Sequence, residues 1–119
     1  MHYIDPNSIV HDDLLSIVSH DIDWNFFKKK SILITGASGF LGSYLVKTFV
    51  YANDLHGLDL DLHCTFRTHN NFSSRLSDLF DHPSFHPIHC DFSSFDLPLF
   101  PQCDLIIHSA SPATPRLFF

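Results

Sequence analysis

The stretch SILITGASGFLG, residues 31–42, decides the fold that we predict for this chain. Residues 32–34 form an apolar run of strand length, apolar at consecutive positions, which is typical of a parallel strand covered on both faces. Three glycines spaced three residues apart follow it: Gly36, Gly39 and Gly42. An apolar pattern with helical spacing begins at once after them. The sequence therefore predicts a strand, a glycine-rich turn and a helix in direct succession.

Each glycine in this turn has a mechanical interpretation. Gly36 lets the chain turn sharply off the strand, and Gly39 removes a side chain where a pyrophosphate approaches the backbone. Gly42 allows the helix to pack closely on the sheet. The N–H groups and the positive dipole end of the helix then face the phosphates. Three glycines alone also fit a purely structural turn, but the strand before and the helix after favour a dinucleotide site. The spacing is one residue longer than GxGxxG between the first two glycines, and the lack of a lysine in the loop excludes a P-loop.

The remaining chain continues the alternation of strands and helices. The first helix is expected to run to about residue 53, and further strands are expected at residues 62–66, 85–90 and 105–109, with a short helix at 74–80. This order predicts right-handed crossovers and a parallel sheet, the N-terminal half of a Rossmann-type doubly wound α/β fold. Residues 1–30 are expected to be a helical extension and residues 31–119 the first part of the dinucleotide-binding domain. Within the extension we expect one short amphipathic helix, with Asp12 and Asp13 near its start, that covers the outside of a sheet or a partner subunit.

Composition limits the classes of function. The chain has 119 residues, 45% hydrophobic and 17% charged, which describes one folded domain or part of one. A net charge of −6 disfavours a nucleic-acid surface, and the lysines at 28–30 are expected to be a solvated approach to the first strand. We expect no signal peptide and no membrane association. Three cysteines without CxxC spacing favour a reduced, cytoplasmic protein.

Three motifs in order resemble a known family. TGASGFLG (35–42) resembles the TGxxGxxG signature of extended short-chain dehydrogenases/reductases, the nucleotide-sugar epimerase, dehydratase and decarboxylase group. HCDFSSF (89–95) is similar to the strand-then-Asp element of that family, and DLIIHSASPATP (104–115) to its D-x-[VI]-[IV]-H-x-A-[AS] segment. The SPATP continuation is most similar to UDP-glucuronate decarboxylases and related dehydratases. The resemblance covers about residues 12–115, and the leading helix matches a subgroup with such an extension.

The resemblance implies an enzyme that oxidises the C4 position of a nucleotide sugar transiently with NAD and then eliminates, decarboxylates or epimerises. It implies that Asp91 and Phe92 line an adenine pocket. In an open parallel sheet, ligands lie across the carboxyl ends of the strands, and the candidate residues all fall at or just past predicted strand ends. The candidate cofactor-binding residues are Gly36, Ser38, Gly39, Phe40, Leu41, Gly42, Arg67, Asp91, Phe92, Ser109, Ala110 and Ser111.

The choice between NAD and NADP depends on the end of the second strand. An acid that grips the ribose is expected about 20 residues beyond the glycines, at the carboxyl end of that strand. Asp59 and Asp61 precede the strand and therefore belong to the wrong end of the sheet. Arg67 stands at the correct end, where it favours a 2′-phosphate or stacks on adenine, or is simply an exposed loop arginine. The resemblance favours NAD, and NADP stays open.

Other reactive side chains are expected to be structural. His82, His86, His89 and Cys90 do not predict a metal site, because alternation places His89 on the opposite side of the strand from His86 and Cys90. His108 is expected to be a hydrogen-bonded core imidazole. Ser109 and Ser111 are expected to meet the cofactor through their backbone.

Catalytic residues of the family are missing from these 119 residues. The family uses a Ser or Thr with a Tyr-x-x-x-Lys pair, in which lysine lowers the pKa of tyrosine, and none of Tyr3, Tyr44 and Tyr51 has a lysine four residues later. We therefore expect the cofactor half of a longer enzyme whose partners are a nucleotide sugar and a second subunit. A non-catalytic NAD(P)-binding module and an inactive remnant are the alternatives. An open sheet edge predicts marginal stability or self-association.

Overall fold

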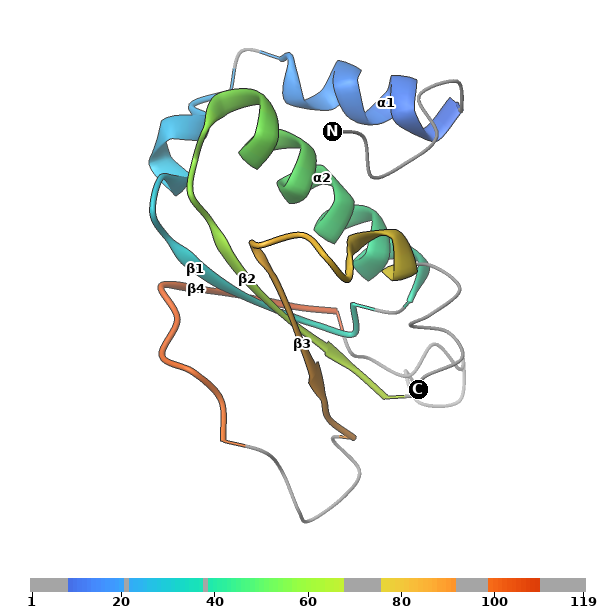
Figure 1. Ribbon diagram of the computed structural model, residues 1–119, viewed down its shortest axis with the longest axis vertical. Coiled ribbons are helices and arrows are strands. Elements are labelled where there is room, and N and C mark those ends of the chain that lie inside the picture. Colours follow the sequence, from blue (N-terminus) through green and yellow to red (C-terminus); the bar gives the residue numbers. More distant parts are fainter. Residues whose placement is uncertain (1–8, 21, 38, 68–75, 92–98, 110–119) are drawn as a thin grey trace, which may run out of the picture.

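The computed structural model describes residues 9–20, 22–37, 39–67, 76–91 and 99–109. Four strands form one parallel sheet in the order β3-β2-β1-β4 (Figure 1). The expected Rossmann-type α/β architecture is confirmed. In chain order the elements are α1 (Ile9–Val18), η1 (Trp24–Phe27), β1 (Ser31–Thr35), α2 (Phe40–His56), β2 (Asp61–Phe66), η2 (Ser77–Leu79), β3 (Phe85–His89) and β4 (Leu105–His108), where η marks a 3-10 helix.

The strand order reverses between β1 and β4. From β1 the chain passes through α2 to β2 and on to β3 in one direction, and it then places β4 on the other side of β1. The register aligns the carboxyl ends of these strands, since Thr35 of β1 pairs with His108 of β4 and Ile34 pairs with Cys64 of β2. Ligands of open parallel sheets bind in the crevice at such a reversal.

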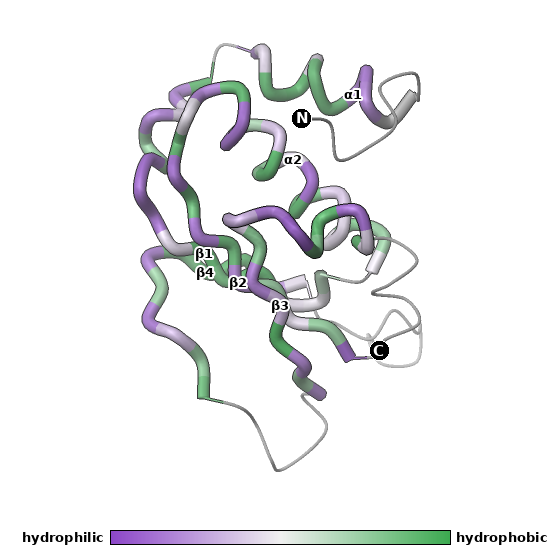
Figure 2. The backbone as a smooth tube through the Cα atoms, viewed as in Figure 1, coloured by the Kyte–Doolittle hydropathy of each residue, from purple (hydrophilic) through white to green (hydrophobic). Residues whose placement is uncertain are grey.

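The core lies between the sheet and α2. Ile32, Ile34 and Leu62 are fully buried, together with Val46 and Val50 of α2. Figure 2 shows a mostly hydrophobic β1 and a mixture of hydrophobic and hydrophilic residues along α2, as a central strand and a helix with one buried side require. Leu33, whose side chain lies on the other face of β1, is also buried.

Helix α2 extends beyond the residue 53 that we expected. It continues to His56 and ends at Gly57, whose φ of 61° is left-handed and whose N–H donates to the carbonyl of Asn53 at 2.9 Å. Glycine is favoured at this capping position because it has no Cβ. The residues between 53 and Gly57 are mostly polar, but the glycine, rather than the polarity, marks the end of the helix.

The N-terminal helix lies on α2 and forms a second layer there (Figure 1). Leu14 and Val18 are fully buried. Nδ1 of His11 lies 2.6 Å from the hydroxyl of Tyr51, and the ring of His56 hydrogen-bonds the carbonyl of Val18. The expectation that this helix covers the outside of the sheet is wrong, because α2 already occupies that face. Contact with a partner subunit stays a prediction.

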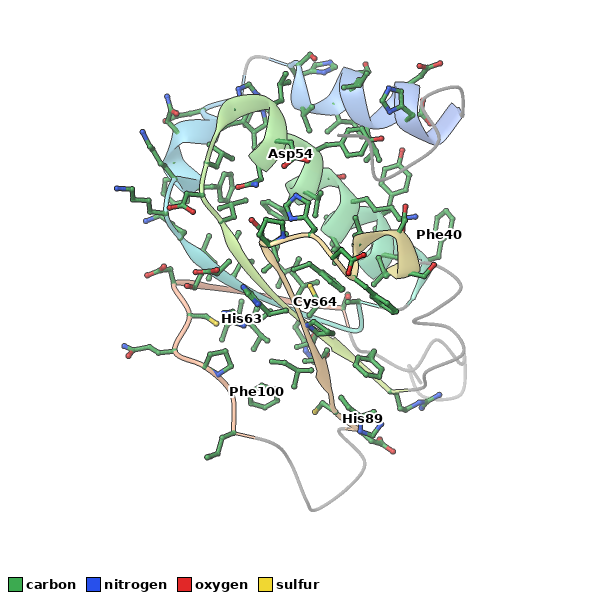
Figure 3. The ribbon with its side chains drawn as sticks, in the orientation of Figure 1. Phe40, Asp54, His63, Cys64, His89 and Phe100 are labelled. Carbon is green, nitrogen blue, oxygen red and sulfur yellow. The ribbon has the colours of Figure 1, made fainter. Side chains whose placement is uncertain are left out.

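The helices of the described residues all lie on one side of the sheet (Figure 1). On the other side, Ile106 of β4 is 67% exposed. His63 stacks on His86 there, with ring centroids 5.0 Å apart, and Figure 3 labels His63 on this side. Burial beside His86 lowers the pKa of His63. No helix in the described part of the chain is long and apolar enough to cross a bilayer.

Candidate functional site

The glycine turn follows β1 directly. Gly36 has a φ of 68°, in the left-handed region that disfavours residues with a Cβ. Its carbonyl accepts a hydrogen bond from the N–H of Gly39 at 3.1 Å, which closes the turn. Gly39 then caps α2 in an extended conformation. The sharp turn expected at Gly36 is present.

Gly42 brings the first turn of α2 against this loop. A Cβ at Gly42 would lie 2.1 Å from the oxygen of Gly36, 2.9 Å from its carbonyl carbon and 3.0 Å from Cα of Ala37. We expected Gly42 to permit close packing on the sheet; the contact that requires glycine is with the backbone of the turn itself. A Cβ at the exposed Gly39 would meet only the oxygen of Gly36, at 3.4 Å, which is an ordinary contact.

The start of α2 contributes backbone amides that have no acceptor within the helix. The N–H of Ser43 donates to the carbonyl of Gly39 at 2.9 Å. The N–H groups of Phe40, Leu41 and Gly42 precede it in the first turn. The residues that lie four positions before them are outside the helix, so the helix itself supplies no acceptor for these N–H groups. The first turn carries no acidic residue. The Phe40 side chain is 77% exposed and projects from the end of the helix in Figure 3. This end of α2 therefore suits an anion.

Strand β2 holds the turn through Thr65, a residue that sequence reasoning did not single out. The N–H of Gly36 donates to its hydroxyl at 3.1 Å, and the N–H of Ala37 donates to its carbonyl at 2.9 Å. Thr65 is buried, with 1% of its surface exposed. The available signal was a hydroxyl residue near the end of the strand that neighbours the predicted turn.

Strand β4 joins the same edge through Ser109. Its N–H donates to the Thr35 hydroxyl at 3.1 Å, and its hydroxyl donates to the Thr35 carbonyl. Nδ1 of His108 lies 2.7 Å from the Thr35 hydroxyl. His108 is thus hydrogen-bonded as expected, but it is exposed rather than part of the core. The reason is that β4 is the outermost strand on its side of the described sheet.

Arg67 and Asp91 follow β2 and β3 at this edge. Arg67 is exposed, and its carbonyl is hydrogen-bonded to the ring of His89 at 3.1 Å. Asp91 is half-buried beyond Cys90, whose N–H donates to the carbonyl of Phe66. The structure therefore brings these candidates to the same edge as the glycine turn. Four further candidates lie outside the described residues: Ser38, Phe92, Ala110 and Ser111.

Acidic residues occupy the opposite edge of the sheet. Asp61 is the first residue of β2, and its N–H donates to the carbonyl of Lys30. Asp104 precedes β4, and its carboxylate accepts the N–H of Ser31 at 2.9 Å. Asp61 therefore lies at the amino end of β2, as predicted, and not at the carboxyl end where an acid would bind the ribose. The Asp of the D-x-I-I-H pattern connects β4 to β1.

The histidines near β3 have protein partners. Nδ1 of buried His82 accepts the N–H of Ser84, and its Nε2 lies 3.0 Å from a carboxylate oxygen of Asp54. His86 instead contacts Asp61 at 3.0 Å. The described ranges contain no group of three His, Cys, Asp or Glu side chains arranged to hold a metal ion.

The two tyrosines of α2 have pKa values raised above their usual value. Burial raises the pKa of Tyr44, and the nearby negative charge of Asp13 raises it further. Burial also raises the pKa of Tyr51, with Asp78 and Asp54 adding to the shift. A tyrosine base needs the opposite shift. Tyr3 lies outside the described residues.

The parallel sheet, its order reversal and the glycine turn at that reversal define a dinucleotide-binding domain of the Rossmann type. The model of the NAD dependent epimerase/dehydratase family matches residues 32–117, and the chain belongs to this family. Membership implies use of an NAD(P) cofactor and a sugar-modifying function. A search of the curated proteins finds no match.

Proposed function

We propose that this chain is the dinucleotide-binding portion of a nucleotide-sugar epimerase, dehydratase or decarboxylase that uses NAD. The observation that carries the proposal is the contact of α2 with the glycine turn, where a Cβ at Gly42 would lie 2.1 Å from the Gly36 oxygen. Because Gly36 and Gly42 have no Cβ, the end of β1 and the first turn of α2 lie close together, with no side chain of these two residues between them. The geometry suits the diphosphate of a dinucleotide.

The residues present fit such a cofactor. The amides of Phe40, Leu41 and Gly42 hold the diphosphate in this proposal, with Ser38 and Gly39 beside them. Asp91 and Ser109 lie at the carboxyl edge of the sheet on the two sides of the order reversal, and we assign the adenine to the side of Asp91. Phe92, Ala110 and Ser111 stay candidate contacts of the cofactor. When bound, NAD supplies the hydride acceptor that a transient oxidation of the sugar requires.

Arg67 keeps NADP as an alternative cofactor. It is exposed at the carboxyl end of β2, where a 2′-phosphate would lie, whereas Asp61 is at the other end of the strand. Replacing Arg67 with alanine is expected to weaken binding of NADP(H) without a matching effect on NAD(H) if the arginine grips the phosphate. If the variant binds each dinucleotide as tightly as wild type does, Arg67 is an exposed loop residue that does not contact the cofactor.

The alternative functions are a non-catalytic NAD(P)-binding module and an inactive remnant. Neither of them needs a Tyr-x-x-x-Lys pair, which these 119 residues do not contain. A parent reading frame that continues to such a pair would favour catalysis. For that parent we propose a nucleotide sugar as the substrate, a homodimeric state and a cytoplasmic location.

The test is isothermal titration of the 119-residue chain with NAD⁺, NADH, NADP⁺ and NADPH. Wild type is expected to bind at least one pair. Gly39→Ala, which meets no steric obstacle within the protein, is expected to fold normally and to lose at least about tenfold in affinity, because its methyl group occupies the approach to the helix amides. Gly57→Ala at the far end of α2 is the matched control and is expected to retain affinity. A folded wild-type chain that binds none of the dinucleotides would refute the proposal.

A further inference from the structure

Two successive amides of the glycine turn are directed at one residue. The N–H groups of Gly36 and Ala37 both donate to Thr65, one to the hydroxyl and the other to the backbone carbonyl. Successive N–H groups of an extended strand point to opposite sides. Their convergence on Thr65 therefore marks the place where the chain leaves β1.

The hydroxyl of Thr65 replaces a missing ladder contact. The β1–β2 pairing extends to Ile34 and Cys64, so Gly36 lies beyond the part of β1 that pairs with β2. Its N–H is instead satisfied by a side chain that is 99% buried, since only 1% of Thr65 is exposed. This hydrogen bond is partly buried, and an N–H that loses its acceptor in such a place is costly, so a residue without a hydroxyl at position 65 would favour other conformations of the turn.

We propose that Thr65 is a positioning residue of the dinucleotide site, an inference that rests on the proposed function. It touches the turn and not the ligand. By fixing the amides of Gly36 and Ala37, it holds the carbonyl of Gly36 against Gly39 and the first turn of α2, and it keeps that turn open to the diphosphate. Loss of this restraint lowers the fraction of protein in the binding-competent conformation, and the apparent affinity falls by the same factor.

Three variants separate the hydroxyl from the size of the side chain. Thr65→Val keeps the β-branched shape and removes the acceptor, whereas Thr65→Ser keeps the acceptor and removes a methyl group. Thr48→Val is the matched control. It removes another threonine hydroxyl, one that donates to the Tyr44 carbonyl at 2.8 Å within α2. A purely structural contribution of threonine would affect Thr48→Val and Thr65→Ser as well.

The experiment combines amide hydrogen exchange with titration of NADH and NADPH into the full chain. In Thr65→Val, the Gly36 amide is expected to exchange about tenfold faster and the dinucleotide affinity to fall roughly fivefold. Thr65→Ser and Thr48→Val are expected to resemble wild type in both measurements.

The outcomes distinguish the inference from the function on which it rests. Unchanged Gly36 exchange or unchanged affinity in Thr65→Val would overturn the positioning role, as would an equal loss of affinity in Thr65→Ser. Wild type that binds neither dinucleotide would overturn the proposed function and the ligand-directed part of the inference. Faster Gly36 exchange in Thr65→Val would then still establish the hydrogen bond that restrains the turn.

Discussion

Gly42→Ala tests the close approach of α2 to the glycine turn. The added Cβ would lie 2.1 Å from the oxygen of Gly36 and within 3.0 Å of two further backbone atoms. Because every obstructing atom belongs to the backbone, no change of side-chain rotamer relieves the clash. The turn and the start of α2 have to separate by roughly 1 Å, which is a small-to-large change in a packed site.

The expected cost is about 2 kcal/mol in the free energy of unfolding. Overpacking of a core site costs about 1–3 kcal/mol. Alanine is a better helix former than glycine by up to about 1 kcal/mol in a helix interior, and this gain offsets part of the cost. Gly42 lies in the first turn of α2, where the offset is smaller than in the interior. For a chain of this size, about 2 kcal/mol corresponds to a fall of roughly 8 °C in Tm.

The assay is thermal and urea unfolding followed by circular dichroism, with Gly57→Ala as the control glycine. No atom lies within 4 Å of a Cβ at Gly57, so its cost comes only from the left-handed φ and is about 1 kcal/mol. Amide chemical shifts locate the damage: Gly42→Ala is expected to shift Gly36 and Ala37, whereas Gly57→Ala is expected to leave them unchanged. A Gly42→Ala protein with the Tm of wild type and unshifted turn amides would refute the steric reasoning.

Two further predictions concern the rest of the sheet. Asp104→Ala removes the acceptor of the Ser31 N–H and is expected to lower the free energy of unfolding by about 1 kcal/mol in urea titrations. Asp81 is exposed, and Asp81→Ala is the control that is expected to change this free energy little. Equal effects of the two variants would contradict the contribution of Asp104 to the β4–β1 connection. Because burial beside His86 lowers the pKa of His63 from 6.5, the unfolded chain binds more protons, so stability is expected to be full above about pH 6.5 and to fall below it. His63→Gln is expected to make that fall below about pH 6.5 shallower, and an unchanged slope would assign the loss to other groups.

The strand, turn and helix at residues 31–42 were predictable from the sequence because each relies on local rules. Residues 32–34 are buried on both faces of β1, and Gly36 has the left-handed φ that its place after a strand requires. The carboxyl-edge positions of Arg67 and Asp91 also followed, since a parallel sheet places its strand ends together.

The contacts between strands were beyond the sequence pattern. The hydrogen bonds of Thr65 join residues 28 and 29 positions apart, and they depend on the relative register of two strands. The exposure of His108 depends on the position of β4 at the side of the described sheet, which hydropathy does not reveal. Likewise, the amphipathic pattern of α1 indicated a buried side but not that α2 would cover it.

The two edges of the sheet use different side-chain acceptors for strand-end amides, and the proposed diphosphate site gives this difference an electrostatic interpretation. At the amino edge, the carboxylate of Asp104 accepts the N–H of Ser31. At the carboxyl edge, the hydroxyls of Thr65 and Thr35 accept the N–H groups of Gly36 and Ser109. A carboxylate at either threonine position would also accept these hydrogen bonds, but its charge would repel a diphosphate at close range in a partly buried site. A neutral hydroxyl fixes the backbone without that repulsion, so the end of α2 keeps its attraction for an anion.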